Sequence, residues 1–413
     1  EYKNVYRPAR VISYDKESGE LVLHNYMDFD DLKDYVKISY ELTQDGLVIS
    51  KGILPEFSVA PHGEGKTNLK INVPENGKCY LKLIYHLKKE LPLLDEDHIL
   101  GFDEIEVSKE DTKCKLAEKW IPKTVVDSEL QVNENDTQIH IKGREFAYTI
   151  DKRTALFTEM KFAGREYLNH PMELNIWRAP TDNDMYIKSE WKKAHYDKAY
   201  TRAYTTEVVQ GKHGVKITSH ASVVAETVQK ILDVTITWKI EAAGKIDADI
   251  AVTKDDEFPD LPRFGVRMFL DKKLSAVRYF GMGPQESYCD KHQAASHGLY
   301  QANVDDLHED YIRPQENGSH YDCEYVELNN SRYGIVASAE NAFSFNASYY
   351  TQEELEEKTH NYELTESDSV VFCVDYALNG IGSNSCGPVV LEQYRFDDVL
   401  FRFQFTLIPY VKG

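Results

Sequence analysis

Apolar residues at every second position recur along this chain, and this period constrains the fold more than any other feature. Clear examples lie at residues 139–141, 146–150 and 246–252. Side chains that alternate with period two share one face of a β-strand, whereas an amphipathic helix needs a period near 3.6. A (β/α)₈ barrel needs roughly 250 residues of alternating strands and helices, and the sequence contains no such stretch. The pattern therefore predicts an all-β protein.

The first hundred residues alternate short apolar runs with turn residues, at the spacing of a small β-sandwich. The pairs Asp45-Gly46 and Asn76-Gly77 favour the backbone twist of tight hairpin turns, so we expect strands to end there. The strands predicted in this part of the chain cover residues 11–14, 20–24, 36–42 and 80–86.

The alternation stops between residues 108 and 123, where the segment SKEDTKCKLAEKWIPK is charged and ends near a proline. A chain of 413 residues also exceeds the usual size of one domain. We therefore predict a first β-sandwich at residues 1–108, a linker at 109–123 and a second, larger β domain at 124–413.

Helical signals are few in this sequence. The segment 351–354 resembles a capping box, in which a threonine side chain and a glutamate close the first turn of a helix. A second short helix is predicted within residues 189–200.

Composition limits the partners and the compartment. The 69 acidic residues exceed the 48 basic ones and give a formal charge of −21, so nucleic acid and anionic membrane surfaces would be repelled. No run of about 18 apolar residues occurs, so we expect no membrane partner. The six cysteines lie far apart without CxxC spacing, which indicates reduced thiols and a cytoplasmic protein. The chain begins with Glu1 and not Met, so we expect it to be a piece of a longer protein.

Conspicuous acids occur in three loop-like motifs, WRAPTDND, GMGPQESY and RPQENGSH. Glycoside cleavage uses two carboxyl groups, one as acid and one as nucleophile or base, which makes these acids candidates. The alternative is that they cap turns or pair with Arg178 and Arg313, and we favour it because structural ion pairs are commoner than catalytic ones. The acids concerned are Asp182, Asp184, Glu286 and Glu316.

Other candidate groups lack a recognisable spacing. His292, His297, His320 and His360 could serve as bases, but none has a motif relation to Ser, Cys or another His. The segment GIGSNSCGP at 380–388 has neither the lysine of a phosphate loop nor a following helix. Its small residues allow a close approach to a ligand or a neighbouring domain, or they form only a long turn.

Several motifs occur in a fixed order that resembles the last domain of the large β-galactosidases of glycoside hydrolase family 2. The first hundred residues similarly resemble the immunoglobulin-like domain that follows the catalytic barrel in that family. The resemblance implies an immunoglobulin-like β-sandwich followed by a large β-supersandwich related to the galactose mutarotase fold. The segments that carry it are LNIWRAPTDND, YFGMGPQESYCDK, YIRPQENGSHYD, the 343–350 strand with its following helix, GIGSNSCGP, and, near the start, EYKNVYRPARV and GILPEFSVAPHG.

The family hydrolyses terminal β-galactosides with retention, through two glutamates on a (β/α)₈ barrel and with the help of Mg²⁺ and Na⁺. The resemblance places both glutamates outside this sequence. It thus implies that the chain carries no catalytic residue and no metal ligand, and that it is inactive alone. The implied partners are the catalytic barrel, on the same chain or on a separate large subunit, and a galactoside substrate, within an oligomeric enzyme.

The resemblance also singles out candidate substrate-binding residues. In the family, a loop of the last domain reaches the mouth of the barrel, and this loop falls on residues 380–388. Cys386 stands where a relative has a tryptophan that stacks on the sugar, so Asn384 or Ser385 would supply hydrogen bonds instead. Whether the loop contacts substrate or only packs between domains stays open. A sharper alternative assigns sugar contacts to Arg178, Asp184, Glu286 and Arg313.

Two other functions remain possible from the sequence. The chain could be a stand-alone galactoside-binding module that uses the open face of the supersandwich. It could also be an aldose-epimerase-like protein, an alternative that rests on fold analogy alone.

Overall fold

The computed structural model describes residues 1–109, 112–121, 130–382 and 387–412. The chain divides into two compact units, one comprising Glu1–Leu116 with His292–Tyr300 and the other comprising Ala117–Lys291 with Gln301–Gly413. Within the described residues there are 24 strands and four α-helices, and the longest helix has seven residues. The prediction of an all-β protein is confirmed. None of the described helices has the length and apolarity needed to cross a membrane.

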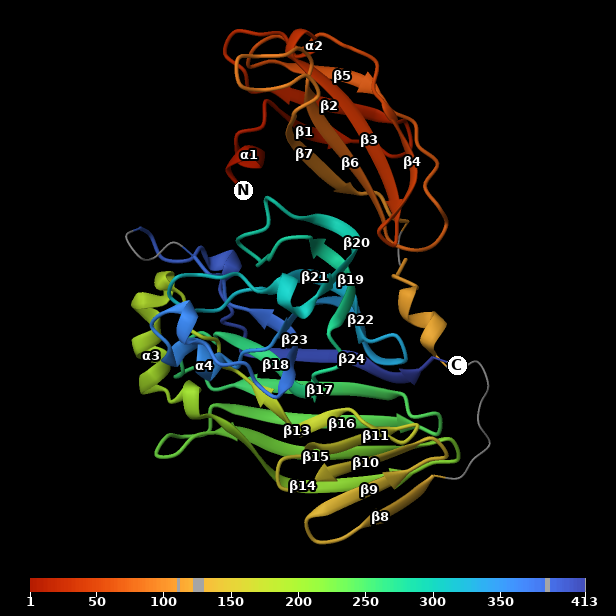
Figure 1. Ribbon diagram of the computed structural model, residues 1–413, viewed down its shortest axis with the longest axis vertical. Coiled ribbons are helices and arrows are strands. Elements are labelled where there is room, and N and C mark those ends of the chain that lie inside the picture. Colours follow the sequence, from red (N-terminus) through yellow and green to blue (C-terminus); the bar gives the residue numbers. More distant parts are fainter. Residues whose placement is uncertain (110–111, 122–129, 383–386, 413) are drawn as a thin grey trace. The chain divides into compact units, whose positions relative to one another are not determined.

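The first unit is a sandwich of two antiparallel sheets (Figure 1). The short helices α1 (Tyr2–Val5) and α2 (Leu32–Tyr35) flank the strands. The smaller sheet has the order β1 (Ala9–Tyr14), β2 (Glu20–Asn25) and β5 (Glu64–Asn68). The larger sheet has the order β4 (Leu47–Ile53), β3 (Val36–Gln44), β6 (Cys79–Leu87) and β7 (Ile99–Glu106). All four strands predicted for this part of the chain are present.

The predicted hairpin at Asp45-Gly46 is also confirmed. Gln44 of β3 pairs with Leu47 of β4, so the turn has only these two residues. Both have positive φ angles, 47° for Asp45 and 78° for Gly46. Positive φ at both central positions is the requirement of a type I′ turn, whose twist matches that of the flanking strands.

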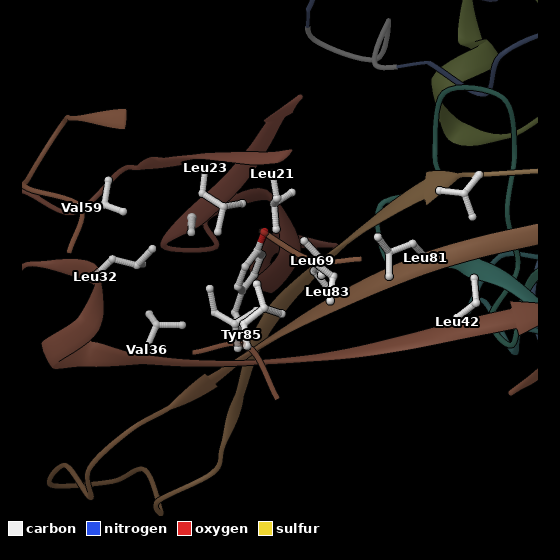
Figure 2. Close-up of a cluster of buried hydrophobic side chains, with 14 of the residues drawn as sticks. Leu21, Leu23, Leu32, Val36, Leu42, Val59, Leu69, Leu81, Leu83 and Tyr85 are labelled. Atoms are coloured by element: carbon white, nitrogen blue, oxygen red, sulfur yellow. The ribbon is translucent and has the colours of Figure 1, made fainter. Parts of the chain in front are cut away.

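The core of the first unit lies between its two sheets, as Figure 2 shows. Leu21 and Leu23 of β2 are buried against Leu81, Leu83 and Tyr85 of β6, all with no exposed surface. These residues occupy every second position of their strands, as period two requires. The alternation read from the sequence therefore marks the buried face of each strand.

The Tyr85 hydroxyl, a polar group in this core, has its hydrogen-bond partner within the first unit. The Tyr85 hydroxyl donates to the Asp103 carboxylate at 2.5 Å, and Arg7 pairs with the same carboxylate at 2.6 Å. Burial and the Asp103 charge raise the pKa of Tyr85 well above its ordinary value. The phenol thus stays protonated and acts as a donor.

The segment His292–Tyr300 belongs to the first unit although it lies far along the chain. The backbone N–H of His297 donates to the Glu104 carboxylate at 3.0 Å, and the Nδ1 atom of His297 lies 2.7 Å from Glu104 Oε1. The ring of His297 also stacks on Tyr80, with centroids 4.1 Å apart. The contacts of His297, which was considered above as a base, are therefore those of a packing residue of the first unit.

The second unit contains two sheets, one of five and one of twelve strands (Figure 1). The five-stranded sheet has the order β12 (Arg165–Glu166), β11 (Leu156–Phe162), β10 (Phe146–Asp151), β9 (Gln138–Lys142) and β8 (Gln131–Glu134). The main path of the large sheet is β13 (Leu168–Asn175), β18 (Arg263–Asp271), β23 (Ser369–Leu378), β22 (Tyr333–Ser348), β24 (Leu400–Val411), β17 (Ile246–Lys254), β16 (Leu232–Glu241), β15 (Gly214–Val224) and β14 (Tyr200–Gln210). Its remaining members are β19 (Ala276–Gly283), β21 (His320–Asn329) and β20 (Ser296–Asn303), whose last three residues belong to the second unit.

The two sheets of the second unit pack against each other around Trp238 of β16. Its indole lies edge-on to Phe157 of β11, with centroids 4.9 Å apart, and its Nε1 donates to the Ala155 carbonyl at 2.8 Å. Trp238 and Phe157 have no exposed surface. One face of the large sheet is therefore covered by the five-stranded sheet.

The helices of the second unit are short, as the sequence predicts. Thr351 caps α4 (Gln352–Glu357) by accepting a hydrogen bond from the Glu354 N–H at 3.1 Å, which confirms the capping interaction. The second predicted helix is α3 (Ile187–Lys193), and it ends before residue 200. His195 adopts a left-handed conformation with φ of 58°, a common way to end a helix. The predicted linker includes residues outside the described part, so the predicted domain limits stay a prediction.

Candidate functional site

Four of the motifs identified in the sequence meet around one pocket of the second unit. The pocket has a volume of about 740 Å³. Its lining comes from the segments 181–183, 286–291, 311–316, 381–382 and 388–394. Loops after different strands thus converge, which is the usual origin of a binding site.

Glu286 is the central acid of this pocket, and its side chain is only 6% exposed. One carboxylate oxygen accepts from the Lys291 ammonium and the Tyr311 hydroxyl, both at 2.5 Å. The other oxygen accepts from the Gly318 N–H at 2.9 Å. Three donors therefore hold this carboxylate, so it positions its neighbours and is poorly placed to attack a substrate.

The partners of Glu286 carry the donors that a ligand in the pocket would meet. Burial and the Glu286 carboxylate raise the pKa of Tyr311 to about 12. Although burial opposes it, the hydrogen bond with Glu286 also raises the pKa of Lys291. The Lys291 side chain is 33% exposed. The Lys291 ammonium can donate to the hydroxyl groups of a sugar, whereas the Tyr311 oxygen, whose proton is donated to Glu286, can accept from them.

The start of the 380–388 loop is held by side chains from two other segments. Asp290 accepts from the backbone N–H groups of Ile381 at 3.0 Å and Gly382 at 2.7 Å, one on each oxygen. The side-chain amide of Asn183 donates to the Gly382 carbonyl. Gly382 has φ of 50°, a conformation that glycine adopts without strain. The backbone entering the loop is therefore fixed in direction.

Arg178 and Asp184 also support the backbone at the start of the 380–388 loop, but they do not line the pocket. The Arg178 guanidinium is fully buried and donates to the carbonyls of Asn379 at 2.5 Å and Gly380 at 3.1 Å. Two further hydrogen bonds join it to Asp184. Sugar contacts by Arg178 and Asp184 stay a prediction, and the observed contacts are those of a structural support.

The other predicted site residues are distributed as follows. Asp182 lines the pocket and its N–H donates to the Gln315 side chain at 3.0 Å. Arg313 is exposed and does not line the pocket. Asn384, Ser385 and Cys386 lie outside the described residues, so their proposed contacts stay predictions.

Glu316 belongs to a buried charge group next to the pocket. It pairs with Arg263 at 3.2 Å, and Arg263 pairs with Asp375 at 2.5 Å. Burial and the nearby Glu316 carboxylate raise the pKa of Asp375 to about 6. Two carboxylates share one guanidinium here, which is a structural use of both acids.

Cys289 of the YFGMGPQESYCDK segment and the candidate base His320 both lie in surroundings that disfavour their charged forms. Burial and the neighbouring Asp290 raise the pKa of Cys289 to about 12, so its thiol is inert. His320 is buried against the rings of Tyr279 and Phe345, with centroids 4.4 Å and 5.0 Å away. Among the described residues, no group of three or more His, Cys, Asp or Glu side chains converges as metal ligands do.

Sequence analysis did not select several polar residues of the pocket, among them Asn183, Asp290, Lys291, Tyr311 and Gln315. Each of them belongs to one of the motifs in which the resemblance was found. Their membership in these motifs is the sequence signal that could have identified them as pocket residues. The acids beside them are more conspicuous in the sequence and drew attention first.

Two protein-family models match this chain. Residues 142–407 match the one described as "Beta galactosidase small chain", and residues 21–108 match "Beta-galactosidase, domain 4". A sandwich followed by a large many-stranded unit is the fold class predicted above. The chain belongs to the β-galactosidase family, of which it carries the domain 4 and small-chain parts.

Individual relatives agree with this assignment. The chain is 43% identical over 411 residues to a β-galactosidase of Actinobacillus pleuropneumoniae, covering 99% of the chain and 39% of that protein. It is 31% identical over 412 residues to a β-galactosidase of Staphylococcus xylosus, covering 98% of the chain and 40% of that protein. The chain thus spans about 40% of the length of these curated relatives.

Solved structures were also compared with the chain. Galactose 1-epimerase from Lactobacillus acidophilus aligns with 69% of the chain and 99% of its own length, with a TM-score of 0.39 and 7% identity.

Proposed function

We propose that this chain is the non-catalytic C-terminal portion of a retaining β-galactosidase that hydrolyses terminal β-D-galactosides. Its role is to complete the rim of the active site with the 380–388 loop and to pack against the catalytic barrel. The observation that carries this proposal is the anchoring of Ile381 and Gly382 by Asp290 beside a large pocket. A loop held so firmly at its base can present its tip to a neighbouring domain.

The chemistry of the pocket supports a non-catalytic role. Retention requires two carboxyl groups about 5 Å apart, one of which attacks the sugar. Glu286 is engaged by three donors and Glu316 is paired with Arg263. The catalytic glutamates would lie on the barrel, with the Mg²⁺ and Na⁺ ions. This chain alone would therefore be inactive.

The donors of the pocket define what the chain adds to substrate binding. Lys291 would donate to sugar hydroxyls, Tyr311 would accept from them because its own proton is donated to Glu286, and Gln315 could both donate and accept. Asn384, Ser385 and Cys386 would meet the substrate from the loop. In this proposal Arg178 and Asp184 act by supporting the loop, and Glu286 acts by holding Lys291 and Tyr311 in place.

The partner would be the barrel, on the same chain or on a separate large subunit, within an oligomeric enzyme. We also propose a cytoplasmic location. Cys79, Cys289, Cys323 and Cys373 carry free thiols, which is the expected state in a reducing compartment.

The test is hydrolysis of a nitrophenyl β-galactoside by the purified chain, alone and after mixing with the remaining part of the Actinobacillus pleuropneumoniae relative. We expect no turnover by the chain alone and turnover only in the mixture. Hydrolysis by the chain alone would refute the proposal. Calorimetry with lactose separates it from a stand-alone binding module, because saturable binding by the isolated chain would favour the module. Accelerated mutarotation of galactose in a polarimeter would instead indicate an epimerase.

A further inference from the structure

A second pocket in the second unit gathers positive charge in a protein that is strongly acidic overall. It has a volume of about 620 Å³ and shares no lining residue with the pocket described above. Lys119, Arg278 and Lys412 all line it, with Trp120 beside them. The formal charge of the chain is −21, so a pocket lined by three cations is unusual for this molecule.

Arg278 lies on β19 directly opposite Glu327 of β21. Side chains opposite each other in an antiparallel pair share one face of the sheet, so Glu327 would be the obvious partner of this guanidinium. Both Glu327 oxygens are already engaged, one by the Tyr325 hydroxyl at 2.5 Å and the other by the Tyr410 hydroxyl. The Glu327 carboxylate thus accepts hydrogen bonds from two tyrosine hydroxyls.

The Nε atom of Arg278 has no hydrogen-bond acceptor among the described residues, although it is buried. A buried donor that lacks an acceptor loses its hydration without compensation, and the penalty is larger for a charged group. Such a group in a binding pocket points to a ligand that supplies the acceptor.

The two lysines add positive charge near the same place. The Lys119 ammonium lies 4.8 Å from the Trp120 ring centroid and 5.9 Å from that of Tyr325. Burial lowers the pKa of Lys119, and the charges of Arg278 and Lys412 lower it further, while Glu327 opposes them. The three cations therefore repel one another across the pocket, and an anion between them would relieve this repulsion.

The second acid of the pocket is engaged on one side. Asp306 accepts through Oδ2 from the backbone N–H of Asn303 at 2.9 Å and from its side-chain amide at 3.0 Å. These bonds close a short turn at residues 304–307. Among the described residues, neither acid of the pocket accepts a hydrogen bond from the Arg278 Nε atom.

We propose that this pocket is a binding site for a small metabolite that carries a phosphoryl or carboxylate group. Arg278 binds the oxyanion through its guanidinium, whose planar set of donors matches phosphate and carboxylate oxygens. Lys119 and Lys412 complete the charge around it. The proposal goes beyond the galactosidase function and does not depend on it, because the two pockets have no residue in common.

The test uses the full 413-residue chain and measures binding of inorganic phosphate and of citrate by calorimetry, at an ionic strength held constant with chloride. We expect saturable binding of at least one of the two ions. The variants Arg278→Gln and Lys412→Gln should each weaken it by about fivefold or more, since each removes a charged partner of the anion.

Matched controls separate a specific site from general electrostatics. Arg202→Gln and Lys216→Gln change the net charge by the same amount at exposed positions of β14 and β15 that do not line the pocket. They should leave the affinity unchanged. Circular dichroism checks folding, and if Arg278→Gln does not fold, the exposed Lys412→Gln decides the question.

The outcomes distinguish the source of the oxyanion. Binding of phosphate alone indicates a phosphoryl ligand, binding of citrate alone indicates a carboxylate ligand, and binding of both supports either. Absence of saturable binding of both ions would overturn the proposal. An equal loss of affinity in the control variants would also overturn it, because the binding would then follow net charge.

Discussion

Arg178 and Asp184 form a buried ion pair through two hydrogen bonds, Nε to Oδ2 at 3.1 Å and Nη2 to Oδ1 at 2.7 Å. The side chains are 0% and 5% exposed. Because Arg178 also donates to the carbonyls of Asn379 and Gly380, the pair connects the WRAPTDND motif to the base of the 380–388 loop. A substitution in this pair should therefore affect stability first.

Asp184→Ala is expected to lower the free energy of unfolding by about 3–5 kcal/mol, because it leaves the Arg178 charge buried and unpaired. Asp182→Ala, two residues away and exposed, is the matched control and should change it by less than about 0.5 kcal/mol. Urea unfolding of the two variants measures the difference. Similar effects of both substitutions would contradict the structural role of the pair.

Gly46 should tolerate a side chain less well than Gly77, although both have φ near +78°. A Cβ atom at Gly46 would lie 2.2 Å from the backbone nitrogen of Leu299, whereas at Gly77 the nearest atoms are side-chain atoms of Asp45 and Gln44 at 3.0 Å. Gly77→Ala should therefore show mainly the left-handed strain of about 1–2 kcal/mol. Gly46→Ala should show this strain together with displacement of a backbone segment.

Both glycines belong to the first unit, so one unfolding curve of that unit compares them. Hydrogen exchange followed by mass spectrometry reports the stability of this unit separately. A Gly46→Ala variant as stable as Gly77→Ala would show that the 292–300 segment does not pack closely on the hairpin.

His320 should make the second unit sensitive to acid. Burial against Tyr279 and Phe345 lowers its pKa to about 4, and the Met282 carbonyl and the Glu286 charge only partly oppose this. Between about pH 6.5 and pH 4, the unfolded chain binds a proton at this histidine that the folded chain does not. The corresponding stability, roughly 3 kcal/mol, is complete above pH 6.5 and is lost as the pH falls to 4.

His320→Phe keeps an aromatic ring in this place and removes the proton site. We expect the difference in unfolding free energy between pH 7 and pH 5 to shrink in this variant. His213→Phe, at an exposed position, should leave the difference as it is in the unaltered chain. Urea titrations at the two pH values provide the measurement, and an unchanged difference in His320→Phe would contradict the assignment.

Asp290→Ala should reduce the activity of the assembled enzyme while the chain stays folded. The substitution releases the N–H groups of Ile381 and Gly382 and lets the loop base move. Misplacement of substrate contacts by about 1 Å lowers rates strongly, so we expect kcat/KM to fall by about tenfold or more. Asp256→Ala, exposed and outside the pocket, is the control, and equal activities of the two variants would refute a role of the loop base in catalysis.

The elements that sequence analysis predicted well are those that short-range physics decides. The strands around Leu81 and Ile139 follow from alternation, the hairpin follows from Asp45-Gly46, and the cap of α4 follows from Thr351. The predicted helix at 189–200 was wrong in its second half. There the left-handed backbone at His195 ends the helix, and Tyr200 begins a strand.

The sequence by itself determined the all-β class and, through its ordered motifs, the β-galactosidase family, because alternation and motif order are local or linear properties. Only the tertiary structure decided which side chains meet. It brought Tyr311 and Lys291 to Glu286, set Arg178 against carbonyls about two hundred residues away, and joined the 292–300 segment to the first unit. Contacts of this kind depend on how sheets pack and loops close. The interaction energies that decide packing and loop closure are shared by residues that are distant in sequence. Asp184, Glu286 and Glu316, three of the acids that looked catalytic in the sequence, accept hydrogen bonds within the fold, and Lys291 and Tyr311, two donors to Glu286, line the pocket.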